Sequence, residues 1–563
     1  MQPVYRAVLG TNDVHDVVVV GSGAGGGPLA YELAKVGARV LVLEKGPRLA
    51  RKQLIHDELA ICRSDFFVPH EEDEPHVLVY GEGKPQRSPQ GWIANCVGGG
   101  TVHMSGFFLR LKPQDFRLRS EVGEIAGTNL ADWPISYAEL APYYDRVEHV
   151  VGVSGKAGIN PFEEPRSGPF PFPPLDEHPV AQEIDRACAQ LGWHAFPLPR
   201  AILTRPVGER SLCSYCALCG SYGCETGAKG STAESVLPAA EATGRCEIRP
   251  GCMAYEIESG KDGLATGVLY FDAEGRTLRA RGRAIVVSCS SIESARLLLN
   301  SRSAAFPQGL GNGNGLVGQN LTFSNHRDGF ARFDIAKRRT SKPWVLSKEP
   351  FIHRCVQDFY FKPKDGVPKG GTLSFLFSHL NPIAAAEAQA VSSKGDLTFG
   401  LQLKDRIRDR IRGSVNISFE SFCESFANPG MHVTLDPDVR DKWGIPSARI
   451  TLAHHPLDLE AADAVHARGL EILAALDPDE SWTPYEFSES MILQYGTCRF
   501  GADPATSVLD RDCRSHEVKN LYVVDGSFMP NPGGVPPTFT IMANSFRVGE
   551  ALAHAFKRRE LPG

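Results

Sequence analysis

The sequence predicts an α/β protein built on a doubly wound, Rossmann-like sheet of parallel strands. Three observations near the start of the chain support this prediction. Four consecutive valines follow Asp16, and such a β-branched run is typical of a strand buried on both faces. A glycine-rich turn then opens a helical pattern of apolar residues, and a second apolar strand, RVLVLE, follows that helix. Strand, turn, helix and strand in this order form the first unit of a doubly wound sheet.

The turn after the first strand carries Gly21, Gly23 and Gly26 in GxGxxG spacing. These glycines let the backbone approach a pyrophosphate at the start of the helix, where unpaired N–H groups favour negative charge. Glu44 ends the second strand, where a carboxylate accepts a hydrogen bond from a ribose hydroxyl and repels a 2′-phosphate. We therefore expect a bound dinucleotide, FAD or NAD rather than NADP.

The composition is that of a globular protein large enough for more than one core. The chain has 563 residues, of which 42% are hydrophobic and 22% charged. The net charge is -6 with both signs well mixed, so we expect no nucleic acid as a partner. We find neither a secretory leader pattern nor an apolar run long enough to cross a membrane. We expect a cytoplasmic protein without a transmembrane segment, with export on a partner's signal as the alternative.

Segments from both ends of the chain resemble the glucose-methanol-choline (GMC) oxidoreductases. NLYVVDGSFMPNPGGVPPTFT, with YGTCRFGADPATSVLD before it, resembles the carboxy-terminal flavin segment of that family. CVGGGTVH resembles the second flavin segment, and VVSCSSIESARLLLNS resembles the strand and helix that complete the FAD domain. DWPISYAELAPYYDRVEHVVGVSG is similar to bacterial members related to gluconate and sugar dehydrogenases. The likeness fails mainly between about 330 and 480, where the family has its variable substrate domain.

The resemblance implies FAD as the cofactor and two domains. The FAD-binding domain would comprise residues 1–118, 200–325 (with the cysteine-rich loop 213–224) and 496–563. Residues 119–199 and 326–495 would form a substrate-binding domain with an antiparallel sheet.

The resemblance also implies which residues contact FAD. These are Asp525 and Gly526 at the ribityl and pyrophosphate part, Gly98 and Gly99 against the flavin, and Thr538 in the carboxy-terminal motif. His103 matches a histidine that is bonded covalently to the flavin 8α carbon in pyranose oxidases and some relatives. The alternative for His103 is a neutral hydrogen-bonding histidine beside the flavin.

The pair of polar residues that the family uses for alcohol oxidation is missing. A histidine three residues before the glycine of "GT" usually takes the hydroxyl proton, and Leu493 holds that position here. A histidine or asparagine usually precedes "PT", and Pro536 stands there. A missing general base costs about 10² to 10⁴ in rate. Three explanations stay open: another residue such as Tyr495 has taken over, the substrate is desaturated without a strong base, or the flavin serves only structure or electron relay.

Four thiols lie close together in the stretch CSYCALCGSYGC, at Cys213, Cys216, Cys219 and Cys224. The CxxCxxC spacing resembles that of ferredoxins, in which consecutive turns direct three sulfurs at one iron–sulfur cluster. Some bacterial GMC sugar dehydrogenases carry a three-iron cluster on an insert in this part of the chain. Zinc, disulfides in an exported protein, and free thiols are the alternatives.

Together these patterns predict an FAD-dependent dehydrogenase that transfers hydride from a hydroxylated, sugar-like or cyclic substrate to flavin. An electron-acceptor protein or a quinone would reoxidise the flavin. The alternative functions are an electron-transfer or structural flavoprotein subunit without alcohol-oxidising activity, and a desaturase-type flavoenzyme.

Overall fold

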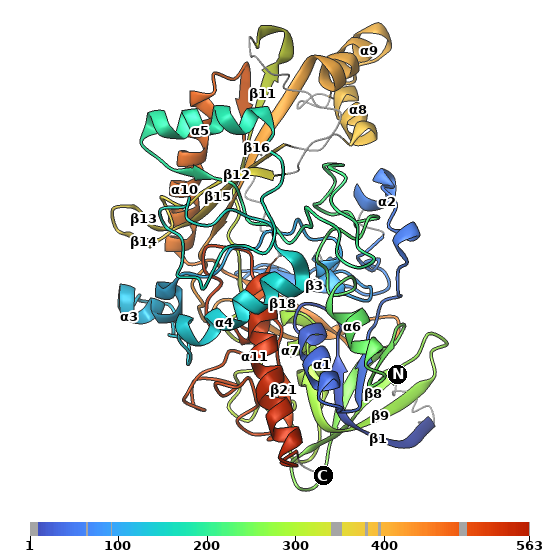
Figure 1. Cartoon of the computed structure of the whole chain (residues 1–563). Helices are drawn as coiled ribbons and strands as arrows, with labels where there is room; N and C mark the ends of the chain where they lie inside the picture. Colours follow the sequence, from blue (N-terminus) through green and yellow to red (C-terminus); the bar gives the residue numbers. More distant parts are fainter. Residues whose placement is uncertain are drawn as a thin grey trace.

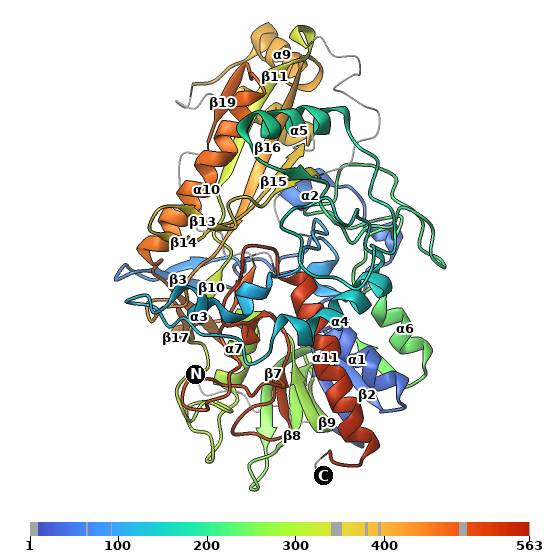
Figure 2. The same ribbon diagram turned by 60° about the vertical axis from the view of Figure 1, so that its left-hand side comes forward.

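The computed structural model describes residues 9–62, 66–91, 93–338, 352–377, 381–391, 396–483 and 493–561. The chain forms two lobes, one above the other in Figure 1. The lower lobe holds both ends of the chain, and helices α1 (Gly26–Lys35) and α11 (Thr538–Lys557) lie side by side in both ribbon views (Figure 2). The upper lobe is formed by segments from the middle of the chain.

The lower lobe is built on a sheet with strand order β6-β2-β1-β9-β8-β7, in which β21 also pairs with β9. The pairs β1–β2, β1–β9, β2–β6 and β9–β21 are parallel, whereas β7 and β8 add antiparallel strands. The bounds are β1 (Leu9–Val20), β2 (Val40–Leu43), β6 (Cys246–Arg249), β7 (Met253–Ser259), β8 (Ala265–Phe271), β9 (Thr277–Val287) and β21 (Leu521–Val523). The predicted Rossmann-like domain is confirmed.

The helices of the lower lobe join the two ends of the chain. α1 packs against both α6 (Val236–Ala242) and α11, and α7 (Ser291–Asn300) follows β9. The backbone N–H of Leu29 donates to Ser545 Oγ at 3.1 Å, and this hydroxyl donates to the carbonyl of Gly25. The carboxy-terminal helix therefore holds the beginning of α1, where the glycine-rich turn ends.

The upper lobe is built on a sheet of antiparallel strands with order β19-β11-β16-β15-β12-β5. One face packs against α10 (Pro456–Ala475) and α5 (Pro179–Leu191) in a separate core that includes Ile417 and Phe419. On the other face Phe422 and Leu376 join the core of the lower lobe. The bounds are β5 (Ala195–Phe196), β11 (Asp328–Asp334), β12 (Ile352–Val356), β15 (Gly371–Phe377), β16 (Ser414–Cys423) and β19 (Glu480–Trp482). The predicted antiparallel substrate-binding domain is confirmed as a fold, and its exact boundaries stay a prediction.

Smaller elements connect the lobes. β10 (Thr322–Phe323) pairs with β20 (Gln494–Tyr495), and β13 (Phe361–Lys364) pairs with β14 (Val367–Lys369). A further sheet has the order β17-β18-β3-β4. The remaining bounds are β3 (His76–Tyr80), β4 (Gln86–Ser88), β17 (His432–Arg440), β18 (Pro446–Leu452), α2 (Glu58–Cys62), α3 (Leu118–Val122), α4 (Tyr137–Val147), α8 (Pro382–Ala390) and α9 (Gly400–Arg408).

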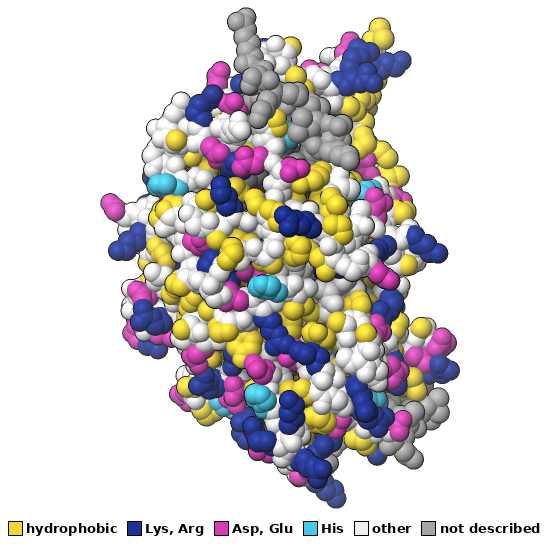
Figure 3. Space-filling view, viewed as in Figure 1, with side chains coloured by type: hydrophobic (Ala, Val, Ile, Leu, Met, Phe, Trp, Pro, Cys, Tyr) yellow, Lys and Arg dark blue, Asp and Glu magenta, His cyan; other side chains and the backbone are white. Residues whose placement is uncertain are grey.

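The face of the molecule seen in Figure 3 carries both signs of charge. Acidic and basic side chains are intermingled over the face shown in Figure 3. None of the helices in the described residues has the length and apolar character needed to span a membrane.

Candidate active site

A cavity lies at the carboxyl ends of β1, β2 and β21 and extends to Leu493 and the start of α11. Ligands of doubly wound sheets bind at this edge. The predicted residues that line it are Gly21, Gly23, Glu44, Gly99, Leu493, Asp525, Gly526 and Thr538. The predicted residues Gly26, Gly98, His103, Tyr495 and Pro536 are chain or packing neighbours of that lining.

The glycine-rich turn has two different reasons to lack side chains. Gly21 has φ +95°, and a Cβ there would lie 2.1 Å from the carbonyl oxygen of Ser288. A Cβ on Gly26 would lie 1.9 Å from the carbonyl oxygen of Gly21. At Gly23 the nearest protein atom to such a Cβ is 3.8 Å away, so this backbone is open toward the cavity. Two glycines thus fold the turn, and the third leaves room for a ligand.

Glu44 is held at the end of β2 by hydrogen bonds from the turn. One of its oxygens accepts from Ser22 N at 3.0 Å and Ser22 Oγ at 2.6 Å, and the other accepts from Gly46 N at 3.0 Å. Burial raises the pKa of Glu44, and these hydrogen bonds oppose the shift. Ser22 Oγ also accepts from Gly98 N at 2.9 Å. The two predicted flavin segments therefore meet at Ser22, and the Glu44 oxygens keep lone pairs for a further donor.

The carboxy-terminal motif closes the other side of the cavity. Asp525 follows β21 and accepts hydrogen bonds from Ser294 Oγ and from Ser527 N, the latter at 2.9 Å. Burial raises the pKa of Asp525, while the serine hydrogen bonds lower it. A Cβ on Gly526 would lie 2.4 Å from the carbonyl oxygen of Gln494. Thr538 begins α11, so the unpaired N–H groups of this long helix lie beside the cavity, where they favour partial negative charge on a ligand.

His103 lies behind the glycines of the second flavin segment. Its ring stacks on Phe67 with a centroid distance of 5.1 Å, and its Nε2 lies 4.0 Å from where a Cβ of Gly100 would be. Burial, together with the nearby Lys229 ammonium, lowers the pKa of His103 to about 3. The imidazole is therefore neutral at pH 7 and borders a residue that lines the cavity.

The positions of the usual catalytic pair are apolar, as the sequence shows. Leu493 lines the cavity with φ +60°, a conformation that is strained for a leucine and concentrates at functional sites. Pro536 is buried in the segment that leads into α11. Tyr495 is fully buried, and its hydroxyl finds no hydrogen-bond partner among the described residues. Burial and the Glu424 carboxylate raise the pKa of Tyr495 well above its ordinary value.

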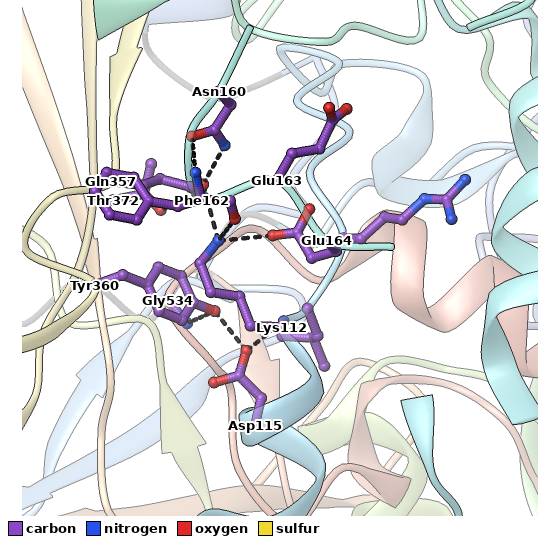
Figure 4. A network of polar contacts seen from close by, with 12 residues as sticks. Lys112, Asp115, Asn160, Phe162, Glu163, Glu164, Gln357, Tyr360, Thr372 and Gly534 are labelled. Atoms are coloured by element: carbon purple, nitrogen blue, oxygen red, sulfur yellow. Dashed lines mark hydrogen bonds and ion pairs between the residues drawn. The ribbon is translucent and has the colours of Figure 1, made fainter. Parts of the chain in front are cut away.

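A buried polar network that includes Tyr360 and Asp115 reaches Gly534, two residues before Pro536 (Figure 4). Tyr360 OH accepts from Gly534 N at 3.0 Å and donates to Asp115 at 2.6 Å. The ammonium of Lys369 donates to the other oxygen of Asp115, also at 2.6 Å. Lys369 and Asp115 side chains are 0% exposed. A buried ion pair needs this full set of hydrogen bonds to offset the loss of water, so the backbone at Gly534 is held firmly.

Sequence reasoning missed Glu424 and His326, whose segments the structure brings beside those of Leu493 and Tyr495. Glu424 directly follows β16, and His326 lies two residues before β11. The pairing of β10 with β20 places these segments beside Leu493. Both Glu424 oxygens and His326 Nε2 are buried without a hydrogen-bond partner in the described residues. No local motif marks either residue, because contacts between distant strands create the arrangement.

The cysteine loop lies over a buried lysine. Tyr215, Ala217 and Ser221 have φ of 56°, 60° and 70°, so three residues with side chains adopt the left-handed region within one loop. Beneath it the Lys229 ammonium donates to the carbonyls of Cys219 at 2.8 Å and Tyr222 at 2.7 Å. The thiols form no disulfide. In the described part of the chain, no three histidine, cysteine or carboxylate side chains form a group that could hold a metal ion.

Comparisons with known proteins agree with this architecture. Residues 86–326 and 430–545 match the GMC oxidoreductase family, and residues 19–54 match the NAD(P)-binding Rossmann-like domain. Paromamine 6'-oxidase of Streptomyces fradiae is 33% identical over 98% of this chain and 94% of its own. 2-Methyl-1,2-propanediol dehydrogenase of Mycolicibacterium austroafricanum is 32% identical over 97% of this chain and 96% of its own. Gluconate 2-dehydrogenase flavoprotein of Pantoea cypripedii is 26% identical over 97% of this chain and 95% of its own.

Among solved structures, pyridoxine 4-oxidase from "Mesorbium loti" superposes with a TM-score of 0.62 at 17% identity. The superposition covers 96% of this chain and 99% of that one, which shows a shared fold over the whole length. The resemblance seen in the sequence is confirmed by the family match and by relatives aligned nearly end to end. The chain belongs to the GMC oxidoreductase family of FAD-dependent enzymes.

Proposed function

We propose that this protein is a dehydrogenase that oxidises the CH–OH group of a sugar-like or cyclic substrate at the Leu493 end of the cavity. The observation that carries the proposal is the cavity itself, formed by glycines whose missing side chains leave the backbone open, by Glu44 and by the start of α11. These groups fit a dinucleotide, because Glu44 would accept a hydrogen bond from a ribose hydroxyl and the backbone at Gly23 leaves space for the pyrophosphate. FAD, when bound there, would supply the acceptor for hydride.

The chain's own groups would orient the substrate and take its proton. The usual partners are replaced by Leu493 and Pro536, so the proton must go to another residue or be lost without a strong base. Tyr495 is the candidate nearest in sequence. Burial and the nearby Glu424 carboxylate raise the pKa of the Tyr495 hydroxyl. The tyrosine therefore stays protonated at pH 7, and a protonated phenol is a poor base.

Anaerobic reduction of the holoprotein tests this function. The compounds to offer are those named for the relatives, paromamine, 2-methyl-1,2-propanediol and gluconate, with a wider panel of polyols and cyclic alcohols. We expect at least one to bleach the flavin absorbance. If dithionite bleaches the flavin and no alcohol does, the result favours a second function, that of an electron-transfer or structural flavoprotein. The apolar residues Leu493 and Pro536 at the usual catalytic positions support this second function. Bleaching by a saturated carbonyl compound would indicate a desaturase-type enzyme instead.

The mode of FAD attachment is a further part of the proposal. A covalent bond from His103 to the flavin is supported by the matching segment VGGGTVH, although Met104 stands where a tryptophan is usual. The neutral ring is the nucleophilic form, and burial keeps it neutral. Acid precipitation should leave the flavin in the protein pellet, and a yellow supernatant would show that no bond exists.

The cysteine loop 213–224 carries the proposal of an iron–sulfur cluster that passes electrons to an acceptor protein or quinone. Its support is the CxxCxxC spacing and the left-handed residues between the thiols. The thiols as they stand do not form a metal-ligating group, so we derive no electron-transfer step through them. Assay of an anaerobic preparation for iron and acid-labile sulfide decides, with zinc, disulfides or free thiols as the other outcomes.

A further inference from the structure

Several buried polar groups near Leu493 lack hydrogen-bond partners among the described residues. They are Thr322 Oγ1, Ser324 Oγ, His326 Nε2, Tyr495 OH and both carboxylate oxygens of Glu424. Glu424 Oε2 lies 4.0 Å from the Lys369 ammonium. Burial raises the pKa of Glu424 to about 8, and this ammonium and the backbone of Gly533 oppose the shift. Most buried polar groups in proteins are paired, so such a concentration indicates a place where a ligand supplies the partners.

His326 is placed in this group by its backbone neighbours. Ser324 N donates to the carbonyl of Leu493 at 3.3 Å, and Asn325 forms a two-way backbone bridge with Cys423. His326 therefore lies opposite Phe422, and the two rings meet at a centroid distance of 4.7 Å. The strand that carries the imidazole thus runs directly alongside the residue that replaces the usual base.

The side chains around His326 show which way its ring turns. Asn325 donates to the Asp458 carbonyl at 2.7 Å and Arg327 donates to Asp463 at 3.1 Å, so both neighbours face α10. Strand alternation directs His326 to the opposite face, which it shares with Phe422. Phe422 contacts Phe107 in the core of the lower lobe. The imidazole consequently faces the lobe that contains the cavity.

The protonation state of His326 suits a proton acceptor. Burial is the larger effect and lowers the pKa of His326 to about 4, while a hydrogen bond to the backbone of Ser421 opposes part of this shift. Donation from Nδ1 in that bond leaves the lone pair on Nε2, the atom without a partner.

Two carboxyl groups face the same side of the sheet as His326. Asp328 and Glu420 are directly paired across β11 and β16, and no described cation pairs with either. Burial raises the pKa of Asp328 to about 6, and burial together with Asp328 raises the pKa of Glu420 to about 8. An imidazolium formed on His326 would be stabilised by negative charge on this pair.

We propose that His326 accepts the hydroxyl proton of the substrate, the role for which Leu493 offers no group. The proposal deepens the proposed function and rests on it. The O–H bond would break with its proton going to Nε2, and the carbinol C–H bond would break with loss of hydride, so that the C–O bond becomes a carbonyl. Bound FAD would supply the two-electron acceptor for that hydride.

The kinetic test compares His326→Asn with His454→Asn. His454 is a matched control, because burial also lowers its pKa to about 4 and it lies near Arg327, on the α10 side. With an alcohol that reduces the wild type, His326→Asn should slow flavin reduction by about 10² to 10⁴. His454→Asn should stay close to the wild-type rate. Adding Leu493→His to His326→Asn should restore much of the loss, which a merely structural role of His326 would not allow.

The pH profile separates His326 from Tyr495. With His326 as the base, the reduction rate should rise by no more than about a few-fold between about pH 6 and pH 9, as Asp328 and Glu420 lose their protons, and should then level off. A rate that rises steadily with alkaline pH would assign the proton to Tyr495, whose pKa is raised, and would overturn the proposal. An unchanged rate in His326→Asn would overturn it as well.

A second readout needs no substrate. In holoprotein labelled at the histidine rings, His326→Asn assigns the His326 nuclear magnetic resonance signal. Reduction of the flavin by dithionite should shift that signal and leave the His454 signal in place. If this holds while no alcohol reduces the wild type, the proposed function fails but the placement of His326 beside the flavin stands. A His326 signal with the same chemical shift in oxidised and reduced holoprotein would overturn the proposal.

Discussion

Two sets of buried carboxyl groups, one in each lobe, differ in the partners that the protein gives them. In the lower lobe, Glu44 and Asp525 each accept several hydrogen bonds from neighbouring serines and backbone N–H groups. In the upper lobe, the Glu424 oxygens accept no hydrogen bond from a side chain of the described residues, and the paired Asp328 and Glu420 have no described cation. The lower-lobe carboxylates are therefore held by protein groups, whereas the upper-lobe polar groups are those that the proposed substrate would satisfy.

The largest expected effect comes from a substitution in the glycine-rich turn of the lower lobe. Gly21→Ala puts a Cβ 2.1 Å from the Ser288 carbonyl oxygen, so the first turn cannot close and we expect loss of FAD and of folded protein. Gly37→Ala is the matched control, since Gly37 has φ +91° but nothing within 4 Å of its Cβ position. It should cost only about 1–2 kcal/mol in unfolding free energy, for the left-handed backbone alone. Flavin content and thermal unfolding are measured for both variants. Equal losses in Gly21→Ala and Gly37→Ala would show that close packing at Gly21 is not the cause.

The next effect concerns the network between the lobes. Lys369→Met leaves Asp115 and Glu424 buried without their cation and should lower the free energy of unfolding by about 3–5 kcal/mol. Lys337→Met removes a lysine from an exposed ion pair with Asp479 and should leave stability close to that of the wild type. Urea unfolding compares them. Similar midpoints for the two variants would show that the Asp115 network contributes little.

A smaller effect appears in the pH dependence of stability. The folded-state pKa of Glu420 is about 8, above the unfolded value, so the folded protein binds more protons between about pH 4 and pH 8. Its contribution to stability is therefore greatest at low pH and is lost as the pH rises through this window. Glu420→Gln should gain in melting temperature over the wild type from pH 5 to pH 8. The same gain in Glu480→Gln, on the exposed edge strand, would indicate a general charge effect.

The smallest effect compares two buried tyrosines. Tyr495→Phe removes a hydroxyl without a described partner, so the free energy of unfolding should be unchanged or higher. Tyr144→Phe removes a hydroxyl bonded to Thr540 at 2.8 Å and should cost about 1 kcal/mol. Equilibrium unfolding in denaturant measures the difference. A loss in Tyr495→Phe as large as in Tyr144→Phe would mean that its hydroxyl is paired.

The same contrast explains what the sequence could predict. The valine run, the glycine spacing and Glu44 are local patterns, and each predicts a βαβ unit that the structure contains. His326, Glu424 and the Asp328–Glu420 pair became recognisable only once distant strands were paired. Periodicity reports which face of a strand is buried, but not which strand lies opposite. The four cysteines show the same limit, since their spacing predicts a shared ligand that the folded loop does not display.

The proposed site holds one FAD between the amino-terminal turn and the carboxy-terminal motif. The most direct measurement is the flavin content of the pure, folded protein, from the flavin absorbance and the protein concentration of the same sample. We expect one FAD per chain, lost together with the fold in Gly21→Ala and retained in Gly37→Ala. Folded protein that stays without flavin absorbance after incubation with excess FAD would contradict it.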